Sequence, residues 1–160
     1  MSGGVTDEFA GVTPQLIVPD TAAAVEFYRQ AFGADELRRN ELPDGRVMLS
    51  ELLVCGGRLL VHDEFAESGA VTPERLGGSP VTLHLYVADV DEVFARAVRL
   101  GATPLMEPQD AFWGDRYAQV LDPSGHRWSF GQKLEDLAPD EINERGRAYL
   151  RDRADPEHPH

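Results

Sequence analysis

TPQLIVPDTAAAVEFYRQAFGA, residues 13–34, has a counterpart in TLHLYVADVDEVFARAVRLGA, residues 82–102. Each segment begins with a short apolar strand pattern. An aspartate typical of a helix N-cap follows, Asp20 or Asp89, and then an amphipathic helix that a glycine stops. Three short strand patterns separated by turn residues come after each helix. The sequence therefore predicts an α+β fold with two βαβββ modules in tandem.

The repeat also predicts how the chain is organised. Beyond the second module, a thin apolar stripe at helical spacing indicates an appended helix, and residues 152–160 are expected to fray. The expected parts are an N-terminal tail (1–12), a first module (13–66), a polar linker (67–79), a second module (80–131), and a C-terminal helical extension and tail (132–160).

The composition excludes several classes of partner. The chain has 160 residues, of which 28 are acidic and 15 basic, and its net charge of -13 disfavours nucleic acid and anionic membrane surfaces. No apolar run approaches the roughly 20 residues of a membrane span, and residues 1–9 lack the pattern of a signal peptide. A cytoplasmic protein is expected. Cys55, the only cysteine, is expected to be a buried small hydrophobe.

Several motifs resemble those of a known superfamily. FY at 27–28 and FGA at 32–34 end the first helix, and DPSGH at 122–126 precedes the last strand. With the tandem repeat, they resemble the glyoxalase/bleomycin resistance/dioxygenase, or vicinal oxygen chelate, superfamily over residues 13–131. FWGDRY at 112–117 resembles its PhnB-like branch and some antibiotic-binding members.

This resemblance implies a curled mixed sheet around a cavity, often completed by a homodimer. It leaves the activity open, because members range from isomerases and dioxygenases to non-catalytic proteins that sequester antibiotics. A small-molecule ligand and a homodimer are therefore the expected partners.

Metal-using members of this superfamily place one ligand on the first strand and one on the last strand of each module. The internal repeat assigns these positions to four residues: Thr13, Thr82, Val61 and Ser129. Such side chains are poor ligands for a divalent cation, so no metal or other cofactor is expected.

A displaced metal site stays open as an alternative. Gln15, Asp63 and His84 lie two residues along from three of the expected ligand positions. Strand alternation is expected to place all three on one face, where they could converge on a metal ion.

Alternation also predicts which side chains line the cavity. Trp128 and Phe130 are expected to pack beneath the second helix, which leaves Ser129 on the cavity face. Trp113, in a loop that bears a glycine, is suited to stack on a flat ligand. Arg116 is expected either to orient an anionic or carbonyl group or to pair with Asp115 or Asp122. The candidate ligand-binding residues are Gln15, Thr82, His84, Tyr86, Phe112, Trp113, Arg116, Tyr117 and Ser129.

Three functional hypotheses follow. The first is metal-independent binding or sequestration of a flat small molecule, such as an antibiotic or a metabolite. The second is a glyoxalase-like lyase or isomerase that uses the displaced metal site or acid–base catalysis by His84 and Asp63. The third is a structural or regulatory dimer whose cavity is vestigial.

Overall fold

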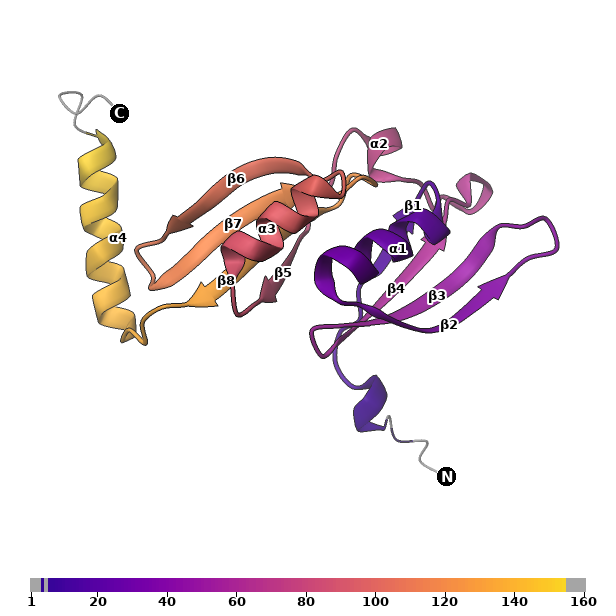
Figure 1. Ribbon diagram of the computed structural model, residues 1–160, viewed down its shortest axis with the longest axis horizontal. Coiled ribbons are helices and arrows are strands. Elements are labelled where there is room, and N and C mark those ends of the chain that lie inside the picture. The colour runs from indigo at the N-terminus through magenta and orange to yellow at the C-terminus, as the bar shows by residue number, and fades with distance from the viewer. Residues whose placement is uncertain (1–3, 5, 155–160) are drawn as a thin grey trace. The chain divides into compact units, whose positions relative to one another are not determined.

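The computed structural model describes residues 4 and 6–154. The chain divides into two compact units, Met1–Leu76 and Gly77–His160. Each unit holds one helix packed on a four-stranded mixed sheet (Figure 1). The predicted α+β fold with two βαβββ modules is confirmed.

The first unit begins with a short 3₁₀ helix, Asp7–Phe9. Its module comprises β1 (Gln15–Val18), α1 (Thr21–Phe32), β2 (Asp35–Glu41), β3 (Val47–Val54) and β4 (Gly57–Asp63). The strand order is β1-β4-β3-β2, in which β1 runs parallel to β4 and the other pairs are antiparallel. A 3₁₀ turn (Ala66–Ser68) and α2 (Pro73–Leu76) follow the sheet.

The second unit repeats this arrangement. Its module comprises β5 (Thr82–Tyr86), α3 (Val90–Arg99), β6 (Thr103–Asp110), β7 (Asp115–Leu121) and β8 (Arg127–Lys133). The strand order is β5-β8-β7-β6, with β5 parallel to β8. The C-terminal helix α4 spans Pro139–Ala154. Residues 152–154, expected to fray, belong to this helix, and 155–160 lie outside the described residues.

Local signals explain where the module helices begin and end. The side chains of Asp20 and Asp89 each accept a hydrogen bond from the backbone N–H three residues on, at 3.1 Å. Gly33 ends α1 in the left-handed region, at φ 68°. Because β3 ends at Val54, Cys55 lies in the following turn with φ 47° and is exposed, so its expected burial is wrong.

Each sheet has one face under its helix and one face turned away from it, which we call the helix-free face. Leu16 and Val18 are buried beneath α1, and Trp128 and Phe130 are buried on the face that α3 covers. The helix-free faces therefore carry the alternate residues of each strand. In the described part of the chain, no helix combines the length and apolar character needed to cross a membrane.

Candidate functional site

The helix-free face of the second sheet carries two rows of neighbouring side chains. Each row takes one residue from each strand, in the order β5, β8, β7, β6. The first row is His84, Ser129, Gln119 and Met106, and the second is Tyr86, Gly131, Tyr117 and Gln109. Five of the candidate ligand-binding residues lie on this face: Thr82, His84, Tyr86, Tyr117 and Ser129.

Hydrogen bonds and ring contacts join the two rows. The Nδ1 atom of His84 and the buried Oγ of Ser129 are hydrogen bonded at 2.7 Å. The His84 ring stacks with the Tyr117 ring at a centroid distance of 6.0 Å and meets Tyr86 edge-on at 4.8 Å. Gln119 Nε2 donates to the Tyr117 hydroxyl at 2.9 Å. The face therefore combines aromatic surface with polar groups.

Gly131 makes room for these rings, a role that the sequence patterns did not reveal. A Cβ atom at this position would lie 3.0 Å from His84 Nε2 and 3.0 Å from Tyr86 Cε1. A larger residue would have to displace one ring or both. The close approach of the rings to the β8 backbone thus depends on glycine at 131.

Asp115, the first residue of β7, is a buried carboxylate on this face. It is 2% exposed, and its Oδ2 accepts hydrogen bonds from the Tyr86 hydroxyl at 2.9 Å and from Trp113 Nε1 at 3.2 Å. The Lys133 ammonium lies 4.0 Å from Oδ1. The hydrogen bond to this carboxylate, followed by partial desolvation, raises the pKa of Tyr86. Sequence reasoning weighed Asp115 only as a partner for Arg116.

Trp113 and Phe112 continue the aromatic surface from the sheet into the β6–β7 loop. The Trp113 ring meets Tyr117 edge-on at 5.3 Å, and Phe112 meets Trp113 edge-on at 5.2 Å. Since Tyr117 stacks with His84, the rings form a continuous series from Tyr86 to Phe112. The two ring contacts and the hydrogen bond from Nε1 to Asp115 together restrain the orientation of the Trp113 indole.

Arg116 lies on the opposite face. It alternates with Asp115 and Tyr117 along β7 and shares the helix-covered side with the buried Ala118. Its guanidinium contacts Asp91 of α3 at 2.6 Å and Asp110 at 2.8 Å, and it holds the pKa of Asp91 below its ordinary value. The expected pairing with Asp115 or Asp122 is therefore wrong, and Arg116 is separated from the aromatic face by the sheet.

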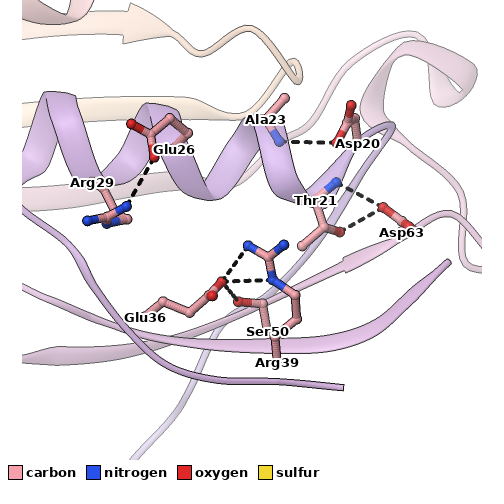
Figure 2. A network of polar contacts seen from close by, with 9 residues as sticks. All are labelled: Asp20, Thr21, Ala23, Glu26, Arg29, Glu36, Arg39, Ser50 and Asp63. Atoms are coloured by element: carbon pink, nitrogen blue, oxygen red, sulfur yellow. Dashed lines mark hydrogen bonds and ion pairs between the residues drawn. The ribbon is translucent and has the colours of Figure 1, made fainter. Parts of the chain in front are cut away.

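Asp63 serves the start of α1 rather than a catalytic site. Its Oδ1 accepts hydrogen bonds from Thr21 N at 2.9 Å and Thr21 Oγ1 at 2.8 Å, and its Oδ2 accepts one from Val47 N at 2.6 Å. Figure 2 shows the carboxylate directed at Thr21. Both oxygens are thus used to fix the helix and β3 beside β4.

The displaced metal site required Gln15 and Asp63 on one face of the first sheet. In the observed register, Gln15 lies beside Leu60, whereas Asp63 lies beside the buried Val18. Alternation then places Gln15 and Asp63 on opposite faces. The expected convergence of these two residues with His84 is wrong, and so is the expectation that Asp63 is available as the acid–base partner of His84.

The register also corrects the internal alignment used for the usual metal positions. His84 lies beside Ser129, and its counterpart Gln15 lies beside Leu60, so Leu60 and not Val61 corresponds to Ser129. Leucine is no better a ligand than valine, and the Ser129 hydroxyl is already bonded to His84. These donors do not fit a divalent cation. Within residues 4 and 6–154, no cluster of three His, Cys, Asp or Glu side chains suited to a metal ion is found.

The helix-free face of the first sheet has a different chemistry. Gln15 and Leu60 share a row with Glu51 and Arg38. Glu51 is 4% exposed, and its carboxylate is ion-paired with Arg38 at 2.6 Å and with Arg58. An arginine–carboxylate cluster therefore occupies the place that aromatic rings occupy in the second unit.

Comparisons with known proteins agree with this fold. Residues 9–130 match the family model described as the Glyoxalase/Bleomycin resistance protein/Dioxygenase superfamily. An uncharacterized protein of Mycobacterium tuberculosis is 43% identical over 134 residues, which cover 82% of this chain and 79% of that protein.

Solved structures show the same similarity. TioX from Micromonospora sp. ML1 is 29% identical with a TM-score of 0.60, over 78% of this chain and 99% of that chain. A gene product of Arabidopsis thaliana is 31% identical with a TM-score of 0.62, over 77% and 98%. FosX, a fosfomycin resistance protein from Listeria monocytogenes, is 16% identical with a TM-score of 0.64, over 84% and 98%, and shares the fold alone.

Proposed function

The chain belongs to the Glyoxalase/Bleomycin resistance protein/Dioxygenase superfamily, and from this premise we propose that its second module binds a flat, partly apolar small molecule without a metal ion. The binding surface is the helix-free face of β5, β8 and β7 together with the Phe112–Trp113 loop. One observation carries the proposal: a continuous series of rings, oriented by the buried Asp115, lies on a face whose superfamily metal positions hold poor ligands.

The side chains on this face supply two kinds of interaction. Trp113, Tyr117 and His84 offer ring surface, and an aromatic pair contributes about 0.5–1.5 kcal/mol beyond the burial of area. Covering about 150 Å² of apolar ligand surface adds about 4 kcal/mol. With one to three ring pairs these terms sum to about 4.5–8.5 kcal/mol before the loss of ligand freedom is subtracted, so the Kd is expected to be weaker than micromolar. Gln119 and Thr82 provide polar groups that orient the ligand.

The proposed ligand class includes antibiotics as well as metabolites. The superfamily's own description names bleomycin resistance proteins, and FosX, which shares the fold, is a fosfomycin resistance protein. The proposal that the ligand is planar is supported by the series of aromatic rings in this chain and not by the names of these relatives. Sequestration requires no reacting group, and the proposal assigns none.

The test is equilibrium binding of acridine, a neutral planar probe at pH 8, in the presence of EDTA and followed by the probe's own fluorescence. We expect saturable binding by the wild type, about tenfold weaker binding by Trp113→Ala, and no displacement by the non-planar adamantan-1-ol. Phe9→Ala is the matched control, because Phe9 is an exposed aromatic of the first unit. Equal affinity of the Trp113→Ala variant, or binding that requires an added metal, would overturn the proposal.

A further inference from the structure

The C-terminal helix α4 lies outside the residues that match the family model, which end at 130. None of its side chains is fully buried, and it is rich in charge. Two of its residues nevertheless contact Phe112 in the loop that carries Trp113, and Arg145 contacts the segment that is hydrogen bonded to Gly114 of that loop. This concentration of contacts calls for a physical reason.

The segment between β8 and α4 is fastened to Gly114. The Gly114 carbonyl accepts hydrogen bonds from Leu134 N and Glu135 N, both at 3.0 Å. Position 114 favours glycine for two reasons. A Cβ atom there would lie 3.1 Å from the Glu135 carbonyl oxygen, and its φ of 94° is in the region that other residues rarely adopt. Glu135 in turn pairs with Arg145 of α4 at 2.7 Å. The start of α4 is thereby tied to the residue that follows Trp113.

Gly146 in the middle of α4 forms a notch for Phe112. A glycine inside a helix costs about 0.5–1 kcal/mol relative to alanine, so its presence needs a compensating contact. A Cβ atom at 146 would lie 3.2 Å from Phe112 Cε2. One turn further on, the Tyr149 ring lies 5.4 Å from the Phe112 ring. Phe112 thus rests against α4 on one side and against Trp113 on the other.

We infer that α4 is a positioning element of the ligand surface, in which Gly146 and Tyr149 hold Phe112 and Phe112 sets the plane of the Trp113 indole. This inference rests on the proposed function for its consequence in binding. Asp115 holds the indole at Nε1, and Phe112 holds it at the ring. Loss of the α4 contact leaves only the Asp115 hydrogen bond and the edge-on contact with Tyr117, so the indole samples a wider range of orientations, including some that do not stack on the ligand.

The test compares two substitutions in α4 with neighbouring controls. Tyr149→Ala removes the ring that backs Phe112, and Gly146→Leu fills its notch. Leu150→Ala and Arg147→Leu change exposed positions of the same helix. The first readout needs no ligand: the emission of Trp113 is isolated as the difference between each protein and its Trp113→Phe counterpart. The second readout is the Kd for acridine, and circular dichroism reports folding.

We expect Tyr149→Ala and Gly146→Leu to shift the Trp113 emission and to weaken acridine binding about two- to tenfold, with the wild-type thermal transition of the second module retained. The two controls should match the wild type in both readouts. Trp113 emission identical to wild type in both substituted proteins would overturn the inference, even where acridine binds normally. If the substitutions shift the Trp113 emission but the wild-type protein does not bind acridine, the positioning role is supported and the proposed function is contradicted.

Discussion

At the residue scale, Asp115 has the largest consequences for the candidate site. Its side chain is buried, yet it contacts two aromatic residues that are partly accessible, and so it orients the Trp113 indole as part of the surface. A buried carboxylate is costly unless it is hydrogen bonded. Here the Tyr86 hydroxyl and the Trp113 N–H both donate to Oδ2, whereas the buried Oδ1 has only the Lys133 ammonium nearby, at 4.0 Å. The buried Asp115 therefore depends on Tyr86 and Trp113 for its hydrogen bonds, and the two aromatic residues depend on Asp115 for their orientation.

The Tyr86–Asp115 hydrogen bond predicts an unusual titration. The bond raises the pKa of Tyr86, so this tyrosine should ionise above the ordinary value of about 10. Its protonated hydroxyl is the donor, so the bond's contribution to stability is fully present below about pH 10. That contribution is lost as the pH rises through the raised pKa. Ultraviolet titration of the wild type minus Tyr86→Phe isolates this group.

Asp115→Asn provides the check on that assignment. Replacing the carboxylate by a neutral amide removes the strongest cause of the shift, and the midpoint of the isolated transition should move down toward the ordinary tyrosine pKa. An unchanged midpoint in Asp115→Asn would show that another group, and not Asp115, controls the hydroxyl.

Asp63 carries a stability prediction. Asp63→Ala leaves Thr21 N and Val47 N without their acceptor, and each such loss costs about 1–3 kcal/mol. We expect the free energy of unfolding of the first unit to fall by about 2–6 kcal/mol, measured by urea denaturation, with acridine binding unchanged. Asp20→Ala, which removes only an exposed N-cap, should cost about 1 kcal/mol. Loss of binding in a folded Asp63→Ala protein would contradict the structural role.

At the element scale, the strands and helices could be predicted because their signals are local. The Asp20 and Asp89 caps, the Gly33 stop and the alternation of buried residues in β1 and β8 all lie within a few residues of what they determine. The predicted order of a strand, a helix and three further strands is found in both modules.

The register of neighbouring strands could not be read from the sequence. The internal repeat matched Ser129 with Val61, one residue away from its counterpart Leu60, and a shift of one residue exchanges the two faces of a strand. The same limit hid the placement of Asp63 opposite to Gln15. Pairing of strands decides both points, and it depends on contacts between residues distant in sequence.

Contacts of the candidate site were missed for a related reason. Phe112, Trp113 and Tyr117 were found because FWGDRY is a compact motif, and His84 was found by alternation. Gly131 gave no signal, since the His84 and Tyr86 rings that require it come from another strand. A glycine in the middle of a helical pattern, as at 146, is the feature that could have indicated a close neighbour.

At the scale of the whole molecule, one fold is used twice with different surfaces. The helix-free face of the first sheet is closed by the ion pairs of Glu51 with Arg38 and Arg58, whereas that of the second presents aromatic rings. The Glu51 carboxylate is engaged by these two arginines and is therefore not available to recognise a flat ligand. The proposed binding surface therefore belongs to the second module, and the acidic net charge of the chain favours neutral or cationic ligands over anionic ones.

The central claim, metal-independent binding at the aromatic face, is tested most directly by following the two indole N–H signals in a ¹⁵N–¹H correlation spectrum during titration with acridine and EDTA. Trp113 donates to Asp115 on this face, and Trp128 donates to Asp122 in the core, so the pair contains its own control. The account predicts that the Trp113 signal moves saturably while the Trp128 signal stays in place. A Trp113 signal that never moves, or that moves only after a divalent metal is added, would contradict it.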